Sequence, residues 1–142
     1  MKKISLLIGL LSISIFSNPK DQPNFVIIYV DDMGYADIGE FQDEKISTPN
    51  LDLMASNGQT WTNFYASSSV CTPSRAGLLT GILPVRNGLY GDQIAVFFPG
   101  SKTGIPKNQL TLAEVFQTNG YSTGIFGKWH LGDAKEFLPT RH

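Results

Sequence analysis

The feature that most constrains the fold is an uninterrupted apolar stretch, residues 25–30, which is rich in β-branched side chains. Such a stretch is typical of a strand buried on both faces of a parallel sheet. Residues 121–126 form a second stretch of this kind. Residues 60–66 are a further strand candidate, because apolar and polar side chains alternate along them. We expect their aromatic side chains Trp61, Phe64 and Tyr65 to be packing residues. Strands and helices in alternation predict an α/β fold, a mostly parallel buried sheet with flanking helices.

Two helices are predicted from their end signals. Residues 48–58 begin with Thr48 as the N-cap, followed by a proline at the first helical position, and they end in glycine. Residues 110–120 carry a capping box, in which Thr111 caps the helix and Glu114 follows three residues later. We therefore expect both helices to keep these boundaries.

Two adjacent carboxylates, Asp31 and Asp32, follow directly after the first apolar stretch. Open α/β sheets place their ligands at this carboxyl end of the strands. Like charges so close together need a cation or a shared proton, and hard oxygen ligands favour Ca²⁺ or Mg²⁺. The alternative is a solvated Asp-Asp turn without a ligand.

The only cysteine, Cys71, lies in residues 67–81, where a loop is predicted to become a helix. Thr72 is the expected N-cap and Pro73 suits the first helical position, so Cys71 would lie just before the helix. Free N–H groups and the positive end of the helix dipole favour an anion there, and Arg75 adds a fixed positive fork. The pattern indicates an exposed nucleophile beside an anion site; the alternative is a buried free cysteine.

The second apolar stretch ends in a Gly-Lys-Trp-His sequence that contains Lys128 and His130. As alternate residues, they would share one face and point into the same site if the strand geometry continues. The alternative for each is a surface lysine and a histidine satisfied within the fold.

Residues 1–17 are predicted to be a secretory signal, with a basic start, an apolar middle and the small residue Ser17 at the cleavage point. A retained anchor or an apolar helix of the fold is the alternative, but the apolar run is short for a stable membrane span. Export to the periplasm or the extracellular space would make a single cysteine a mark of special chemistry. The net charge of −1 gives no indication of a nucleic acid partner.

Three motifs resemble those of type I sulfatases, which belong to the alkaline phosphatase superfamily. The sequence Cys-Thr-Pro-Ser-Arg at residues 71–75, followed by Leu-Thr-Gly at residues 79–81, resembles the first sulfatase signature. Residues 30–37 resemble the opening motif, and residues 120–130 resemble the second signature. The resemblance covers residues 23–142 and only the N-terminal part of a complete enzyme. It implies that residues 18–142 are the N-terminal portion of a truncated catalytic domain with an alkaline-phosphatase-like sandwich.

The resemblance also implies roles. Cys71 would be oxidised to formylglycine by a formylglycine-generating or other sulfatase-maturating enzyme, and the hydrated aldehyde would be the nucleophile. Asp31 and Asp32, together with oxygens at the modified Cys71, would bind Ca²⁺, with Mg²⁺ as the alternative. Arg75 and Lys128 would orient the nucleophile or the sulfate, and His130 would bind the nucleophile or transfer its protons. The substrate would be a sulfated small molecule or glycan, and the 142 residues alone would be inactive.

Three other functions remain open at this point. A phosphonate or phosphate monoester hydrolase shares the superfamily and sometimes the motif. A thiol enzyme would use Cys71 directly. A non-catalytic truncated fragment would bind a partner or have no activity.

Overall fold

The structure is a computed structural model that describes residues 22–39, 46–91 and 96–142. The predicted signal, residues 1–17, lies outside the described residues. The chain divides into two compact units at Val30, so residues 22–30 are the described part of the first unit and the rest belongs to the second. Every site residue predicted above, from Asp31 onward, belongs to the second unit.

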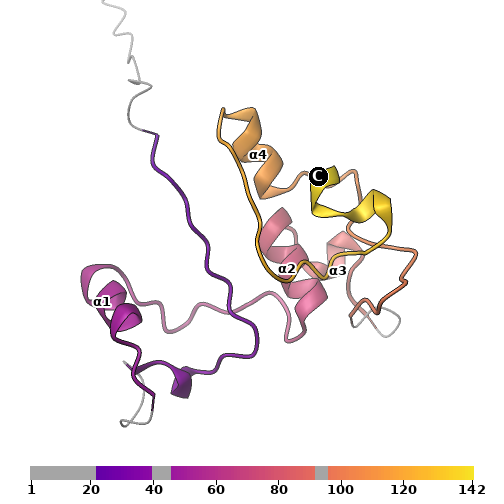
Figure 1. Cartoon of the computed structure of the whole chain (residues 1–142). Helices are drawn as coiled ribbons and strands as arrows, with labels where there is room; N and C mark the ends of the chain where they lie inside the picture. Colours follow the sequence, from indigo (N-terminus) through magenta and orange to yellow (C-terminus); the bar gives the residue numbers. More distant parts are fainter. Residues whose placement is uncertain (1–21, 40–45, 92–95) are drawn as a thin grey trace, which may run out of the picture. The chain divides into compact units, whose positions relative to one another are not determined.

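The second unit is built from short helices joined by long loops (Figure 1). Helix α2 contacts both α3 and α4, so it is the centre of the packed part of this unit. None of the described helices is long and apolar enough to cross a membrane. The α-helices are α1 (Pro49–Asn57), α2 (Cys71–Thr80), α3 (Pro84–Asn87) and α4 (Leu112–Thr118), and the 3₁₀ helices are η1 (Tyr35–Asp37), η3 (Lys135–Phe137) and η4 (Pro139–Arg141).

The predicted helix boundaries are confirmed for α1 and α4. Thr48 is the N-cap residue of α1, although its hydroxyl donates to the Asp52 side chain instead of capping a backbone N–H. At α4 the capping box is complete, because the Thr111 hydroxyl accepts the N–H of Glu114 and the Thr111 N–H donates to Glu114 Oε2 at 2.7 Å. These reciprocal bonds satisfy backbone donors that a helix start leaves free.

The strand predictions are not confirmed, since no strand occurs in the ranges 22–39, 46–91 and 96–142. Residues 25–30 and 121–126 run as irregular chain, and most of their apolar side chains are exposed; Val26 is 81% and Phe126 is 97% exposed. A strand exists only when its N–H and C=O groups pair with a neighbour, and the described segments do not pair in this way. Among the residues that the structure describes, helices of the predicted α/β fold are present and the sheet is not.

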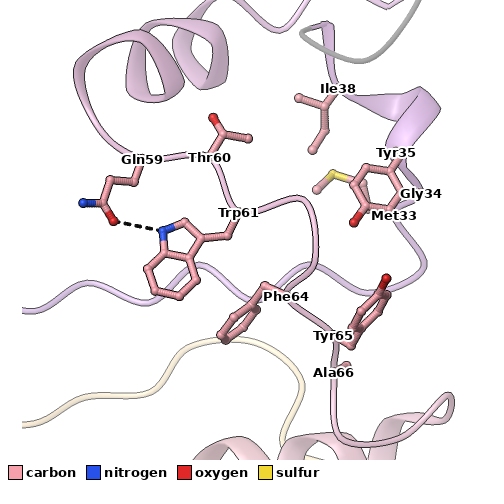
Figure 2. A pocket seen from close by; sticks show the side chains of 10 residues that line it. All are labelled: Met33, Gly34, Tyr35, Ile38, Gln59, Thr60, Trp61, Phe64, Tyr65 and Ala66. Atoms are coloured by element: carbon pink, nitrogen blue, oxygen red, sulfur yellow. Dashed lines mark hydrogen bonds between the residues drawn. The ribbon is translucent and has the colours of Figure 1, made fainter.

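Residues 59–66 and 33–38 line an open cleft of about 640 Å³ within the second unit (Figure 2). Trp61 and Phe64 make an edge-to-face contact with ring centroids 6.0 Å apart, and both side chains are more than half exposed. The Tyr35 hydroxyl donates to the Thr62 carbonyl at 2.6 Å, which holds the two walls together. The prediction that these aromatic side chains are packed is therefore wrong for the described chain, in which no sheet covers them.

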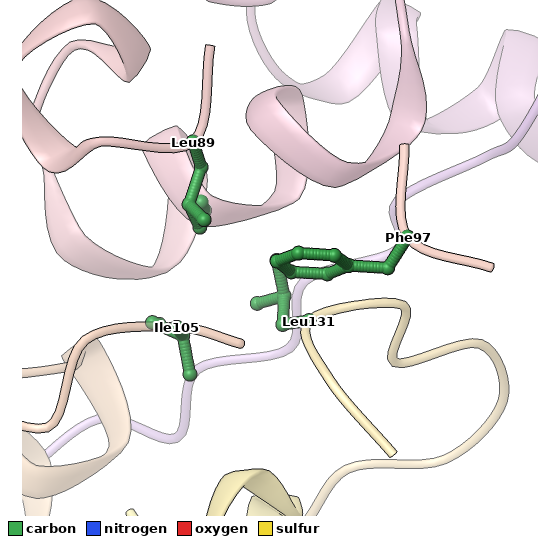
Figure 3. Close-up of a cluster of buried hydrophobic side chains, with 5 residues drawn as sticks. Leu89, Phe97, Ile105 and Leu131 are labelled. Carbon is green, nitrogen blue, oxygen red and sulfur yellow. The ribbon is translucent and has the colours of Figure 1, made fainter. Parts of the chain in front are cut away.

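A small apolar core lies beneath α2 and joins it to two loops that come later in the chain. Figure 3 shows its side chains pointing toward one another. The Ile105 N–H donates to the Leu131 carbonyl at 2.8 Å, and Gly104 leaves no room for a methyl group against the Phe137 ring. The residues around positions 97, 105 and 131 are thereby held against α2. The buried members of the core are Ala76, Leu89, Phe97, Ile105 and Leu131.

Candidate active site

Helix α2 places Cys71 in its first turn. The helix begins at Cys71 itself, and Val70 is the N-cap residue with an extended backbone (φ −124°, ψ 156°). The prediction that Thr72 caps the helix is therefore wrong; the Val70 carbonyl accepts the Ser74 N–H at 3.2 Å, and the Thr72 hydroxyl bonds elsewhere. Cys71 is a partly exposed free thiol at the positive end of the helix dipole.

Arg75 lies one turn beyond Cys71, so both side chains are on the same side of α2. Its Nη1 donates to the Lys128 carbonyl at 2.6 Å, and its Nη2 is 3.6 Å from Asp31 Oδ2. The Arg75 side chain is only 11% exposed. The guanidinium therefore joins the start of α2 to the segments that carry Asp31 and Lys128.

Lys128 and Asp31 form an ion pair, in which Lys128 Nζ donates to Asp31 Oδ2 at 2.7 Å. This hydrogen bond lowers the pKa of Asp31, and the positive charges of Lys128 and Arg75 lower it further. The same hydrogen bond raises the pKa of Lys128. Desolvation acts in the opposite direction, and negative charge at Cys71 would raise the pKa further. Lys128 is thus a cation close enough to Cys71 for their charges to interact.

His130 has its backbone in the left-handed region (φ 58°), so the strand geometry does not continue to it. The prediction that Lys128 and His130 share a strand face is therefore wrong. The His130 Nε2 lies 2.6 Å from the Phe97 carbonyl oxygen. Because a carbonyl can only accept, Nε2 must carry the proton. The other ring nitrogen, Nδ1, is buried and makes no hydrogen bond within the described part of the chain.

Thr72 has contacts that the sequence did not predict. It is completely buried, its hydroxyl donates to the His130 carbonyl at 2.9 Å, and it accepts the Phe97 N–H at 3.1 Å. The two partners lie 58 and 25 residues away in the sequence. A threonine next to Cys71 carries no local signal of such distant contacts, and its residue type alone suggested only a cap.

The predicted metal ligands are not gathered into a cation site. Among the residues described, no three or more acidic, histidine or cysteine side chains come together in a way that could hold a metal ion. Asp32 has a left-handed backbone (φ 60°), and Asp31 Oδ2 is bound to Lys128 and lies near Arg75. Calcium takes about 6–8 oxygen ligands, so Asp31 and Asp32 could supply only part of a calcium site.

The structure brings Asp31, Arg75 and Lys128 into direct contact, and His130 and Cys71 lie close enough to interact electrostatically with this group. Asp32 is the predicted site residue that no described contact joins to the group. The result is a partly exposed thiol at a helix start with an ammonium and a guanidinium nearby. Such a site can bind an anion and stabilise charge on it.

The sulfatase family profile matches residues 23–137, which include all of the site residues above. The chain belongs to the sulfatase family.

Among its relatives, bovine (Bos taurus) arylsulfatase A is 52% identical over 122 residues, which are 84% of this chain and 24% of the relative. Human (Homo sapiens) arylsulfatase G is 51% identical over 118 residues, which are 83% of this chain and 22% of the relative. The crystal structure of Ps i-CgsB matches with a TM-score of 0.71 and 37% identity over 78% of this chain and 24% of that one. A structure of Ps i-CgsB in complex with k-i-k-neocarrahexaose matches equally well, with 36% identity. The chain thus spans about a quarter of the length of these relatives.

Proposed function

We propose that the protein is a sulfuric ester hydrolase in which this chain supplies the nucleophile and two of the charges that bind the sulfate. The observation that carries the proposal is the position of Cys71 at the start of α2, with Arg75 and Lys128 linked through Asp31 beside it. The sequence of this site lies inside the segment that matches the sulfatase family.

The two cations address the main difficulty of the reaction, which is that the substrate is an anion. An ammonium has three N–H donors, and Lys128 uses one of them for Asp31, so the others can bind sulfate oxygens. Its raised pKa keeps Lys128 charged at neutral pH, and Arg75 is always charged. Because Arg75 is fixed by the Lys128 carbonyl and by Asp31, these charges are already in place before the substrate binds.

Cys71 is proposed to be converted to formylglycine by a maturation enzyme, and the hydrated aldehyde supplies a nucleophile that can release sulfate and regenerate itself. Around it, His130 is placed to move protons, because Nε2–H is held by the Phe97 carbonyl and Nδ1 is left as the basic nitrogen. The start of α2 offers backbone N–H groups to the bound anion.

Calcium binding by Asp31 and Asp32 is part of the proposal, with Mg²⁺ as the alternative. Their carboxylates are the type of donor that both ions prefer. Since Lys128 donates to Asp31 Oδ2, a cation that binds this oxygen competes with the ammonium for it. Displacement would free a further N–H of Lys128 for the substrate.

We further propose the substrate class, the location of the protein and the boundary of its catalytic domain. The solved relative that binds k-i-k-neocarrahexaose supports a sulfated glycan as the substrate, with a sulfated small molecule as the alternative. Export through a signal at residues 1–17, to the periplasm or the extracellular space, follows from the sequence pattern. We also infer that residues 18–142 are the N-terminal portion of the catalytic domain, because the relatives are about four times as long as their matched part.

The test uses the protein expressed from its native gene in a host with maturation machinery. Mass spectrometry of the tryptic peptide Ile46–Arg75 should show a mass about 18 Da below that of the unmodified thiol, as expected when an aldehyde replaces CH₂SH. The same preparation should hydrolyse an aryl sulfate faster than the matching aryl phosphate. An unmodified thiol together with a preference for the phosphate ester would refute the proposal and favour a phosphate or phosphonate monoester hydrolase.

A further inference from the structure

We propose that Thr72 is a positioning residue for the reaction, because it fixes the place and the tautomer of His130. The inference rests on the proposed function, in which His130 binds the nucleophile or moves its protons. It assigns a role to the second residue of the Cys-x-Pro-Ser-Arg motif, where the motif itself specifies no residue type.

Three hydrogen bonds form a closed ring between Thr72, His130 and Phe97. The Thr72 hydroxyl donates to the His130 carbonyl at 2.9 Å and accepts the Phe97 N–H at 3.1 Å. The His130 ring closes the circuit, since its Nε2 lies 2.6 Å from the Phe97 carbonyl. His130 is therefore held at both ends, by its backbone on one side and by its ring on the other.

The ring of hydrogen bonds maintains a backbone conformation at His130 that is uncommon for residues other than glycine. A left-handed φ such as the 58° of His130 is uncommon for a residue with a Cβ and persists only where neighbouring contacts enforce it. The Thr72 hydroxyl enforces it through the His130 carbonyl. Without the hydroxyl, that carbonyl and the buried Phe97 N–H both lose a partner, which is costly in a closed interior.

The same contacts determine which ring nitrogen of His130 exchanges protons. Thr72 fixes the Phe97 peptide through its N–H, and the carbonyl of Phe97 accepts the proton of Nε2. Nδ1 is then the basic nitrogen, and it is buried without a hydrogen-bond partner among the described residues. If the Phe97 peptide moves, the ring can rotate or change its tautomer, and the basic nitrogen is no longer in its place.

The experiment compares three variants of the protein expressed from its native gene. Thr72→Val keeps the shape and removes the hydroxyl, whereas Thr72→Ser keeps the hydroxyl. Thr111→Val is the matched control, because Thr111 is equally buried (2% exposed) but its hydroxyl caps α4. The kcat and KM for an aryl sulfate are measured, and each kcat is divided by the aldehyde content of Cys71 from mass spectrometry.

We expect Thr72→Val to lower the corrected kcat by about 10- to 100-fold with little change in KM, as for a displaced proton-transfer group. Thr72→Ser should stay within about threefold of wild type, since the hydroxyl bonds are kept. Thr111→Val should lower the melting temperature and leave the corrected kcat unchanged. Equal activity of Thr72→Val and wild type, or equal losses in Thr72→Ser and Thr72→Val, would overturn the proposal.

A second measurement does not depend on the variants folding or on sulfatase activity. With ¹⁵N-labelled histidine, the NMR shifts of the wild-type His130 ring should show the Nε2–H tautomer. The Nδ1–H tautomer would overturn the role of Thr72 even in an active enzyme. If the wild type shows the expected tautomer and hydrolyses no sulfate ester, the proposed function fails, whereas the Nε2–H form of His130, on which the role of Thr72 depends, stands.

Discussion

Replacing Lys128 with methionine is expected to strengthen calcium binding at Asp31. In the structure Lys128 Nζ occupies Asp31 Oδ2 at 2.7 Å, so the ammonium and the metal compete for one oxygen. Methionine keeps much of the length of the lysine stem and removes the charge. Asp31→Ala removes the oxygen itself and should weaken calcium binding.

The size of the effect follows from the exposure of the ion pair. The two side chains are 44% and 40% exposed, so the pair is closer to a surface salt bridge than to a buried one. Exposed pairs contribute little because water competes for both charges, so the gain in calcium affinity should be only about 1.5- to 5-fold. The gain should shrink as ionic strength rises, because salt screens exposed charges.

Isothermal titration of calcium into the protein expressed from its native gene measures this affinity directly. Lys135→Met is the matched control, since it removes the same charge from an exposed position in η3. Lys128→Met should bind calcium more tightly than Lys135→Met at low salt. Equal or weaker binding by Lys128→Met would show that Lys128 does not compete for Asp31.

Three further outcomes are expected. Hydrogen bonds from the hydroxyl and the N–H of the N-cap residue Thr111 lower the pKa of Glu114. The stability that Glu114→Gln removes should therefore be present in full above about pH 4.3, the ordinary pKa of glutamate, and should be lost as the pH falls through the lower pKa of the folded state. Denaturant unfolding of the wild type and of Glu114→Gln at pH 7 and pH 3 tests this. Gly104→Ala should cost about 1–3 kcal/mol of unfolding free energy, because the methyl group would meet the Phe137 ring, and a calorimetric melting temperature equal to that of wild type would contradict it. Residues 1–142 alone should hydrolyse an aryl sulfate no faster than their Cys71→Ala variant, since the described residues form no cation site.

The parts of the fold that the sequence predicted correctly are those with local causes. The capping box of Thr111 and Glu114 joins residues three positions apart, and the proline and glycine at the ends of α1 act on their own backbone. Gly81, the last residue of the segment predicted to turn from loop to helix, ends α2 in the left-handed conformation that glycine adopts most easily. Each of these signals is complete within about one helical turn.

The parts that the sequence did not predict depend on distant partners. An apolar stretch such as residues 25–30 indicates a strand, but the strand forms only where another segment pairs with it. In the same way, Thr72 was expected to cap a helix, and its hydroxyl instead bonds to segments far along the chain. The motifs identified Arg75 and Lys128 as site residues, whereas their shared partner Asp31 was expected to face a metal.

The burial of Thr72 has a consequence for the order of events during synthesis. The residue beside the proposed modification site is enclosed only when the segment of His130 arrives, 58 residues later. Ribosomes add about 5–20 residues per second, so Thr72 stays open for at least roughly 3–12 s after it is made. Under the proposed modification, this is the shortest time for which the chain around Cys71 is accessible to a maturation enzyme. Slower translation between the two segments would raise the modified fraction, and faster closure of the hydrogen-bonded ring would lower it.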